Sequence, residues 1–364
     1  MTTTIDNEQK TLNVPNLRFP EFEGEWQENY VNEICNEFKS GKAIKADLIL
    51  DVGTYPVFGG NGLRGYTSTY NHDGLFVLIG RQGALCGNVR SVIGKTYITE
   101  HAIAVNGNNK SDTNFLHYLF LQMDLGRFSD QSAQPGLAVN KLLKLKVITP
   151  RIDEQRKIAN LLRLLDERIA TQNKIIEKLE SLIKGIRNDV FGKLRKSVGF
   201  NAMIGDVLSY EQPQSYLVED TEYTNEGTPV LTANKAFVLG YTSEIEGIYD
   251  KGDCIIFDDF TLDCKYVDFS FKVKSSAIKI LTAKNKELLR YTFEFLKYLD
   301  LSTEEHKRHY ITETQNQEFI LPTVQIIRTI AHAFYALSLW KETIVKQRYA
   351  FEKQKQYLLR QMFI

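Results

Sequence analysis

The chain contains two long stretches in which apolar residues recur at alternating steps of four and three. This spacing puts the apolar side chains on one face of a helix that packs against a partner helix. In the first stretch no Pro or Gly interrupts the pattern before Gly185, Gln172 is the only polar position, and Asp153 is the expected N-cap. The predicted apolar seam consists of Ile158, Leu162, Leu165, Ile169, Ile176, Leu179, Ile183 and Ile186, with Val190 after it.

The second stretch keeps the same register near the end of the sequence but is more polar. Its apolar residues are spaced by seven with Phe334 alongside, whereas the companion positions Lys341, Arg348 and Lys355 are charged. This pattern predicts a helix with a thinner, partly exposed seam. The members of that seam are Ile330, Phe334, Leu337, Ile344, Phe351 and Leu358.

Helices of this length have an apolar stripe that extends beyond any one small domain, so each needs a partner. The simplest partner is the other long helix of the same chain. We therefore expect an antiparallel coiled coil with pseudo-twofold symmetry and with globular domains at opposite ends. The alternative is that each helix folds back on its own domain.

Both globular parts show the pattern of mixed α/β domains. Short apolar runs separated by Gly- and Asn-rich turns predict strands at 75–79, 97–99, 101–105, 146–148, 254–257, 269–273 and 277–280, and helices at 115–125 and 287–301. The expected organisation is a lead-in over 1–25, a first domain over 26–150, a spacer helix over 151–195, a second domain over 196–322 and a second spacer helix over 323–364.

The two halves of the chain resemble each other at a nearly constant offset. The segment Gly65-Tyr-Thr-Ser68 recurs letter for letter as Gly240-Tyr-Thr-Ser243. Further matches in the same order pair 32–34 with 205–207, 55–57 with 228–230, Cys86 and Val89 with Cys264 and Val267, 102–103 with 277–278, Pro150 with Pro322, and Arg156, Ile158 and Ala159 with Arg328, Ile330 and Ala331. We interpret the order of these matches as a tandem duplication; chance similarity between two unrelated α/β domains is the alternative.

Composition narrows the class of protein. A chain of 364 residues, 43% hydrophobic and 25% charged, has the size and composition of two ordinary globular domains. No apolar run reaches the roughly 18 residues of a membrane span, and the polar first ten residues do not form a secretory signal. Four cysteines without CxxC spacing give no zinc signature and indicate a reducing cytoplasm.

The charge balance of 45 basic against 45 acidic residues argues against a protein that holds nucleic acid by charge alone. It allows local basic patches, or partner subunits that contact the phosphates. The loops are rich in groups that bind phosphates or base edges, because Arg can bond guanine and Asn or Gln can bond adenine through two atoms. For any single one of these residues a solvated surface role is the alternative. The DNA-binding candidates are Lys39, Lys42, Lys45, Asn61, Arg64, Arg81, Gln82, Asn88, Arg90, Gln131, Gln134, Lys141, Gln212, Gln214, Asn234, Lys235, Lys265, Lys274, His306, Lys307, Arg308 and His309.

No catalytic motif is evident, so we predict no catalytic residue, bound cofactor or metal in this chain. The adenine-methyltransferase Asn-Pro-Pro-Tyr motif and the P-loop are missing. Asp258-Asp259 with Asp263-Cys-Lys265 resembles a nuclease arrangement, but the first half has Gly80-Arg81 and Leu85-Cys-Gly87 there. His101 and His117 have no nucleophile at a recognisable spacing, which makes core or surface packing the default interpretation.

One junction resembles a known family. The string Gly136-Leu-Ala-Val-Asn-Lys-Leu-Leu-Lys-Leu-Lys-Val-Ile-Thr-Pro150, followed by Arg-Ile-Asp-Glu154-Gln155-Arg-Lys-Ile158, resembles the end of a recognition domain and the start of a spacer helix in type I restriction–modification specificity subunits. The lead-in from Val14 to Trp26 is similar to that of staphylococcal members. The second junction departs from the pattern, with Gln325-Ile326-Ile327 where the first has Asp153-Glu154-Gln155.

The resemblance implies a non-catalytic subunit whose two domains each read one half of a split double-stranded DNA target, while the coiled coil sets the spacer. It implies docking of two methyltransferase subunits, with S-adenosylmethionine, and of two motor–nuclease subunits, with ATP and Mg²⁺. Two other functions stay open: a stand-alone DNA methyltransferase or nuclease, and a coiled-coil adaptor with no DNA role.

Overall fold

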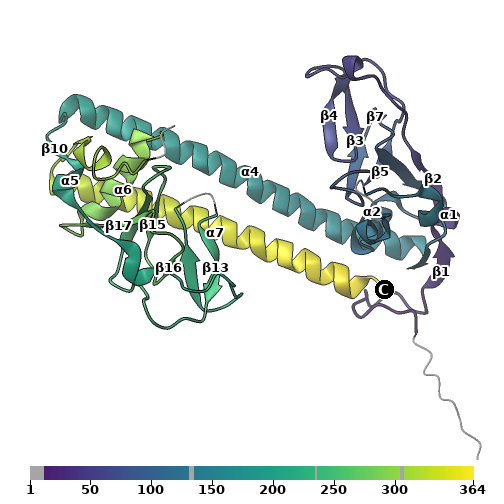
Figure 1. Cartoon of the computed structure of the whole chain (residues 1–364). Coiled ribbons are helices and arrows are strands. Elements are labelled where there is room, and N and C mark those ends of the chain that lie inside the picture. Colours follow the sequence, from purple (N-terminus) through teal and green to yellow (C-terminus); the bar gives the residue numbers. More distant parts are fainter. Residues whose placement is uncertain (1–11, 131–134, 234–235, 304–306) are drawn as a thin grey trace, which may run out of the picture. The chain divides into compact units, whose positions relative to one another are not determined.

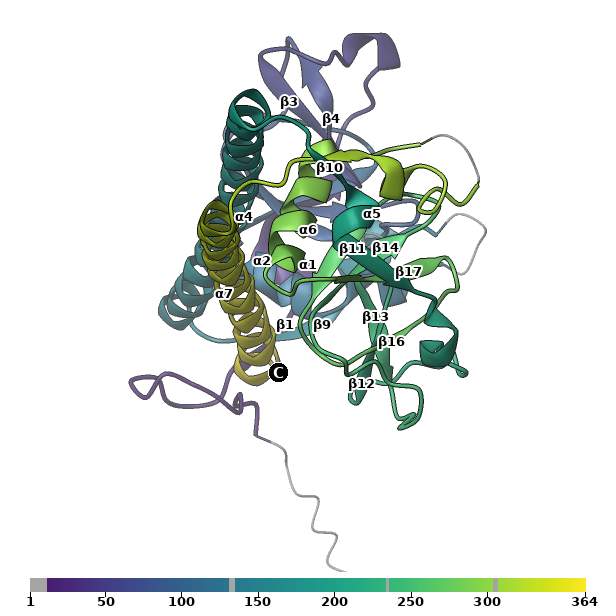
Figure 2. The ribbon, with the colours of Figure 1, turned by 90° about the vertical axis from the view of Figure 1, so that its left-hand side faces the viewer.

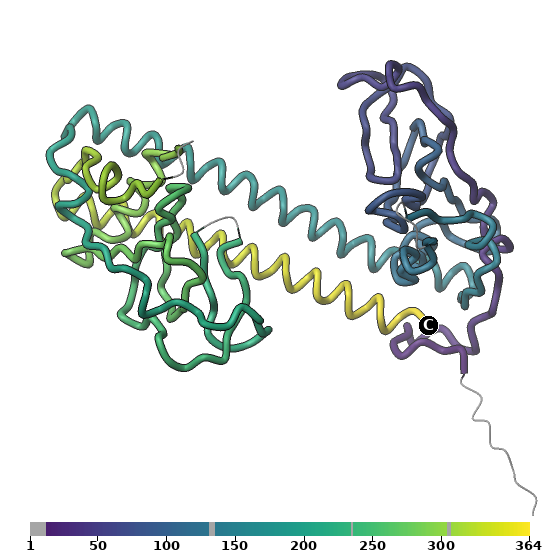
Figure 3. Tube along the Cα trace, in the orientation of Figure 1, coloured from purple at the N-terminus to yellow at the C-terminus, as the bar shows by residue number. Residues whose placement is uncertain are grey.

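The structure is a computed structural model that describes residues 12–130, 135–233, 236–303 and 307–364 (Figure 1). The chain divides into two compact units. Unit 1 consists of the residues up to Gln172 together with Gln347–Ile364, and unit 2 consists of Asn173–Lys346. The long helices α4 (Ile152–Ser197) and α7 (Val324–Met362) therefore contribute to both units, and each is drawn as one unbroken coil in Figure 3.

Among the described residues of unit 1, a four-stranded sheet has the order β2-β8-β5-β6, a three-stranded sheet has the order β4-β3-β7, and β1 pairs with β9. The pair β3 and β7 is parallel, and the other pairs are antiparallel. The strands are β1 (Gln27–Tyr30), β2 (Cys35–Ser40), β3 (Tyr55–Gly59), β4 (Gly62–Thr67), β5 (Leu75–Gly80), β6 (Val89–Ile93), β7 (Tyr97–Ile98), β8 (Ala102–Gly107) and β9 (Lys146–Thr149).

The described part of unit 2 repeats this topology strand for strand, with orders β11-β17-β14-β15 and β13-β12-β16 and the pair β10-β18. Its strands are β10 (Ala202–Met203), β11 (Leu208–Glu211), β12 (Thr228–Leu231), β13 (Val238–Thr242), β14 (Cys254–Asp258), β15 (Cys264–Val267), β16 (Lys272–Val273), β17 (Ile278–Ala283) and β18 (Glu318–Phe319). The predicted fold class, two tandem mixed α/β domains produced by duplication, is confirmed.

Short helices occupy equivalent places in the two repeats. Helix α1 (Val31–Ile34) corresponds to α5 (Ile204–Val207), and in each an acidic side chain accepts the backbone N–H just before the helix: Glu33 from Tyr30 at 2.7 Å and Asp206 from Met203 at 2.8 Å. The remaining helices are α2 (Thr113–Gln122), α3 (Val139–Leu142), α6 (Leu288–Leu299) and the 3₁₀ turns η1 (Ala46–Leu48), η2 (Leu125–Phe128), η3 (Pro213–Tyr216) and η4 (Thr314–Asn316).

Strand registers show where the sequence alignment of the two repeats was right and where it was wrong. Pro56 lies opposite Tyr66 as Pro229 lies opposite Tyr241, which confirms that match. Cys86 and Cys264 are not equivalent, because Cys264 pairs with Phe257 in the place where Val89 pairs with Ile79. The β5–β6 turn, 81–88, is longer than the β14–β15 turn, 259–263, so the offset changes there.

A second alignment error lies one strand later. The registers of β8 and β17 put Ile278 in the place of Ala102 and Lys279 in that of Ile103, one residue away from the predicted match. The connection before β17 is one residue longer than the connection before β8, which accounts for the shift.

Several predicted element boundaries were also wrong. Helix α4 begins at Ile152, so Asp153 lies in its first turn and is not the N-cap, although an acid there still favours the positive end of the helix dipole. The strand predicted over 269–273 is limited to Lys272–Val273. Helix α2 ends at Gln122, three residues early, and continues as the 3₁₀ turn η2.

In each unit the core joins a globular part to segments of both long helices. In unit 1, Phe115 of α2 clusters with Leu162 of α4 and stacks on Phe363 after α7, with ring centroids 5.3 Å apart. In unit 2, Phe295 of α6 clusters with Phe191 of α4 and Phe334 of α7, and Figure 2 shows α6 beside the four-stranded sheet. Within each unit the long helices therefore pack on each other, as the coiled-coil prediction requires. They also pack on the adjacent domain, as the alternative prediction requires.

The two long helices run antiparallel within each unit. In unit 1, Lys355 Nζ lies 2.6 Å from Asp166 Oδ1. In unit 2, Lys341 Nζ lies 2.6 Å from Glu180 Oε1, and Arg187 lies over the Phe334 ring. Two charged positions of the thinner seam, Lys341 and Lys355, thus pair with acids on α4, whereas Arg348 lies 3.6 Å from Glu352 of α7 itself. The predicted seam residues are all buried or half-buried.

Candidate nucleic-acid interface

In the first repeat, three turns meet at one end of the two sheets. They are the turn at 59–62 between β3 and β4, the turn at 81–88 between β5 and β6, and the connection at 99–101 between β7 and β8. Arg81 N donates to His101 O at 2.9 Å. A Cβ on Gly60 would lie 2.7 Å from His101 O, and one on Gly80 would lie 3.0 Å from Gly60 O. Glycine at both positions allows this close approach of the backbones.

Six of the predicted DNA-binding residues lie on these turns and the adjoining strands β4 and β6. We call this set the first patch: Asn61, Arg64, Arg81, Gln82, Asn88 and Arg90. Gln82 Oε1 lies 2.9 Å from His101 Nδ1. His101, for which the sequence predicted a packing role, therefore lies beside the first patch.

The three arginines of the first patch have no ion pair with any residue that the structure describes. Some arginines elsewhere are paired, as Arg18 is with Glu154, Arg187 with Glu294 and Arg328 with Glu287. Others in the described part of the chain, such as Arg168 and Arg195, are not. The first patch therefore brings three arginines together, with Glu100 as the acidic residue of the adjoining connection, where its Oε1 lies 3.3 Å from His101 Nε2.

The equivalent turns of the second repeat contain the three carboxylates that resembled a nuclease site, and the structure gives each a structural contact. Asp258 Oδ1 accepts from the backbone N–H groups of Phe260 and Thr261, at 2.9 Å each. Asp259 Oδ1 accepts from His309 N and Tyr310 N, and its Oδ2 lies 3.3 Å from Lys279 Nζ. Asp263 pairs with Lys297 at 3.1 Å. Among the residues described, no group of His, Cys, Asp and Glu could hold a metal ion.

Cations also lie at these turns in the second repeat, but they come from different elements. Lys274 follows β16 and Arg308 lies next to the segment that Asp259 holds; both are exposed and neither has an ion pair in the described part of the chain. Gln214, in η3, is exposed as well. Lys307 pairs with Glu313, Lys265 with Asp263, and Gln212 accepts from Lys279.

The other predicted DNA-binding residues have varied surroundings. Lys42 and Lys45 are exposed, Lys39 pairs with Glu37 at 3.3 Å, and Lys141 pairs with Asp130 at 2.7 Å. The His309 side chain is 1% exposed and its Nδ1 lies 2.9 Å from Glu313 Oε2, so the buried ring does not present itself to a ligand. Gln131, Gln134, Asn234, Lys235 and His306 lie outside the described residues.

The cysteines are unsuited to nucleophilic chemistry. Burial raises the pKa of the Cys35, Cys254 and Cys264 thiols to about 12, so they stay protonated at neutral pH. Burial is also the main cause that lowers the pKa of His117 to about 4. This ring packs edge-on against Tyr118 and has no nucleophile beside it.

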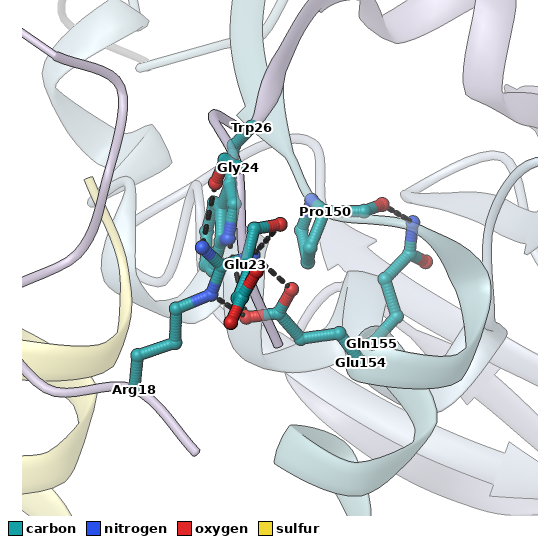
Figure 4. A network of polar contacts seen from close by, with 7 residues as sticks. All are labelled: Arg18, Glu23, Gly24, Trp26, Pro150, Glu154 and Gln155. Carbon is teal, nitrogen blue, oxygen red and sulfur yellow. Dashed lines mark hydrogen bonds and ion pairs between the residues drawn. The ribbon is translucent and has the colours of Figure 1, made fainter. Parts of the chain in front are cut away.

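Sequence reasoning missed the role of the junction that carries the family resemblance. Glu154, 2% exposed, accepts two bonds from Arg18 at 2.7 Å each and one from Trp26 Nε1 at 3.3 Å (Figure 4). Gln155, fully buried, donates to Pro150 O and Lys110 O and accepts from Asp112 N. Glu154 and Gln155 thus fasten the lead-in and the loop before α2 to the start of α4.

Comparisons with known proteins identify the domain. Residues 23–181 match the family model described as "Type I restriction modification DNA specificity domain". The chain is 42% identical over 154 residues to the EcoprrI specificity subunit of Escherichia coli, covering 41% of this chain and 38% of that protein. It is 45% identical over 126 residues to the EcoR124I/EcoR124II specificity subunit, covering 33% and 31%. The matched segments thus span less than half of these relatives.

Solved structures agree over the full fold. The S subunit of a type I restriction–modification system from M. genitalium superposes with a TM-score of 0.73 at 17% identity, covering 96% of this chain and 99% of that one. None of the described helices is long and apolar enough to cross a membrane. Residues 23–181, which contain the first repeat, are therefore similar to type I restriction–modification DNA specificity domains. Over its whole length the chain shares the fold of the M. genitalium S subunit.

Proposed function

We propose that this chain is the DNA sequence-specificity subunit of a type I restriction–modification complex in the cytoplasm and that it performs no chemistry itself. The observation that carries the proposal is the group of three arginines without ion pairs in the described part of the first repeat, within the segment that matches the DNA specificity domain. Lysine and arginine without acidic partners are available to neutralise phosphates, and fixed arginine and amide groups can read base edges.

The proposed target is bipartite and asymmetric. The strand topology is the same in both repeats, but the side chains at the equivalent turns differ: Arg81 in the first repeat takes the place of the buried Asp259 in the second. Readers with different groups at the same positions select different bases. The first domain, residues 26–150, would read one half of the target, and the second, 196–322, the other half.

The long helices are proposed to set the unread spacer and to bind the methyltransferase subunits. Exposed large apolar side chains gather on α7 within unit 2, where Tyr335, Leu339 and Trp340 are 53%, 50% and 54% exposed. Exposed apolar clusters of this kind are typical of protein–protein contacts. Two methyltransferase and two motor–nuclease subunits would supply S-adenosylmethionine, ATP and Mg²⁺, and they would share the phosphate contacts, which fits the neutral total charge.

Methylation mapping tests the proposal. The chain is co-expressed with its methyltransferase subunit in cells that otherwise lack N6-methyladenine, and the methylated positions are mapped across the genome. We expect one two-part motif with a fixed spacer. Methylation without a motif would refute sequence reading, and methyl transfer by the purified chain alone would refute the non-catalytic assignment.

Exchange and insertion variants test the division of labour. Replacing residues 26–150 with those of another specificity subunit should change one half of the motif only. Inserting four residues, slightly more than one turn with a rise of about 6 Å, into both α4 and α7 should lengthen the spacer by one or two base pairs of about 3.4 Å. An unchanged spacer would contradict the role of the helices.

A further inference from the structure

We infer that Arg90 reads a guanine in the half-site recognised by the first domain. This inference rests on the proposed function and goes beyond it, because it assigns one base-specific contact to one residue. Arg90 lies on β6, the edge strand of the four-stranded sheet, directly opposite Leu78 of β5. Its backbone is therefore fixed by the sheet, unlike that of a cation on a loop.

The Arg90 side chain is half-buried beside the turn between β3 and β4. Its guanidinium lies against Gly62, the first residue of β4, where an added Cβ would approach Cζ to 3.0 Å and would overlap Nη1. Gly62 has φ +109°, a conformation that other residues rarely adopt. The turn therefore leaves room for the guanidinium only because residue 62 is glycine.

The polar atoms of Arg90 are divided between the interior and the surface. Nε is buried and has no hydrogen-bond partner among the described residues. Nη1 and Nη2 also have no described partner but are not buried, so the outer edge of the guanidinium reaches the surface within the first patch. A planar group that presents two unpaired donors at the surface matches guanine O6 and N7.

Base reading accounts for this arrangement better than phosphate binding does. A phosphate contact needs positive charge but little orientation, and an exposed Arg64 or a mobile lysine supplies it. A half-buried side chain with a buried Nε has fewer orientations open to it than an exposed one, which lowers its ordering cost on binding and favours contacts that depend on geometry. Gln82 and Asn88 lie on the turn at 81–88 that leads into β6, and they add further groups able to read base edges.

The second domain offers a matched position without these properties. Lys265 pairs with Ile256 in the place where Arg90 pairs with Leu78. Its ammonium lies 3.9 Å from Asp263 Oδ2, whereas Asn88 is the uncharged counterpart of Asp263. A lysine partly neutralised by a carboxylate lacks the two-donor plane, so we expect no equivalent guanine contact there.

The test uses the complete complex with its methyltransferase subunit and duplexes carrying the mapped motif, with each base pair of either half replaced in turn. The variants are Arg90→Lys, which keeps the positive charge but loses the planar pair of N–H donors, and Arg90→Ala. Lys265→Ala is the matched control in the second domain. We expect both Arg90 variants to lose about ten- to a hundredfold discrimination at one guanine of the first half, with the second half unchanged. Lys265→Ala should leave the first half unaffected.

Each other outcome overturns the inference. If Arg90→Lys discriminates like the wild type while Arg90→Ala weakens binding to all sequences, Arg90 contacts a phosphate. If discrimination falls equally in both halves, the effect is not local reading. Unchanged reading of the second half within the same molecule shows that the variant complex is folded. If the wild-type complex has no sequence preference at all, the proposed function fails and the inference falls with it.

Discussion

The two repeats share a backbone but differ in the polar groups that stabilise it. At the equivalent turns, Arg81 N donates to His101 O in the first repeat and Asp259 N donates to Ala277 O in the second, both at 2.9 Å. The first repeat has a buried Ile103 where the second has the fully buried Lys279, paired with Asp259. The two repeats thus keep the same topology with the same backbone hydrogen bonds between strands. Because these bonds do not depend on the side chains at the turns, those side chains can differ.

The helices that cover the two sheets differ in the same way. In the first repeat Tyr118 of α2 donates to Asp166 of α4 at 2.8 Å. In the second, Glu294 of α6, 1% exposed, lies 2.7 Å from Arg187 and 3.1 Å from Arg290. Each network fits only its own repeat, because exchanging one partner would leave a buried group unpaired.

The largest expected effect comes from Lys279→Ile, which gives the second repeat the residue of the first. It should destabilise unit 2 by about 3–5 kcal/mol, because Asp259 would stay buried and charged without its partner. Hydrogen exchange of β14 and β17 during urea titration measures this. Ile103→Val, the conservative control in the first repeat, should cost about 1 kcal/mol. Partial recovery in Lys279→Ile with Asp259→Asn is also expected, and a tolerated single variant would show that the buried pair is dispensable.

A smaller loss is expected for Glu154→Ala, about 3 kcal/mol, because Arg18 and Trp26 would lose their shared partner in a buried setting. Trp26 reports the change directly: in a Trp340→Phe background it is the only tryptophan, so its fluorescence should shift and its urea transition move to lower concentration. Ile326, 37% exposed, is the equivalent residue in the first turn of α7. Ile326→Ala should cost less than about 1 kcal/mol, and equal losses at both junctions would contradict the difference between them.

Much of this fold could be predicted because it follows local periodicity. The seam from Ile158 to Ile186 and the apolar strands β5 and β14 follow from spacing alone. The duplication was visible because the short strands β3 and β12 kept Pro56 and Pro229. Alignment failed where turns changed length, because a turn of 81–88 against 259–263 shifts the offset without leaving a pattern.

The polar interior could not be predicted in this way. Glu154 binds a partner 136 residues away, and Lys279 binds Asp259 across two strands, so neither pair has a sequence spacing that identifies it. The candidate interface was predicted in part, because six of the predicted residues lie on adjoining turns and strands. Nothing in the sequence indicated that His101 would lie beside Gln82, or that the Arg90 guanidinium would lie against Gly62. Long-range strand pairing alone brings these groups together.

Acidification should affect the two repeats unequally. Burial, and next the charge of Lys355, lower the pKa of His117 to about 4, while Asp166 opposes this shift. At the equivalent position of α6 the second repeat has Phe293, which does not titrate. Below an unfolded pKa of about 6.5 the unfolded chain binds a proton that the folded chain does not, so stability present above that pH is lost as pH falls toward 4. Unit 1 should lose about 2 kcal/mol between pH 7 and 5. His117→Phe should reduce the dependence on pH of the free energy of unfolding of unit 1, followed by Trp26 fluorescence. An unchanged dependence on pH would contradict His117 as the cause.

The smallest expected difference separates the two ion pairs between the long helices. In unit 1, Lys355 is 17% exposed and also lies over the Tyr118 ring, whereas in unit 2 Lys341 is 38% exposed and its partner Glu180 is 52% exposed. Exposed pairs contribute about 0–1 kcal/mol because water and salt screen them, and partial burial increases the contribution. Lys355→Met should therefore destabilise unit 1 by about 1 kcal/mol, and Lys341→Met should change unit 2 by less than about 0.5 kcal/mol. Hydrogen exchange at low and at 0.5 M salt measures both, and a larger, salt-sensitive loss at Lys341 would mean that the exposed pair is the one that holds the helices together.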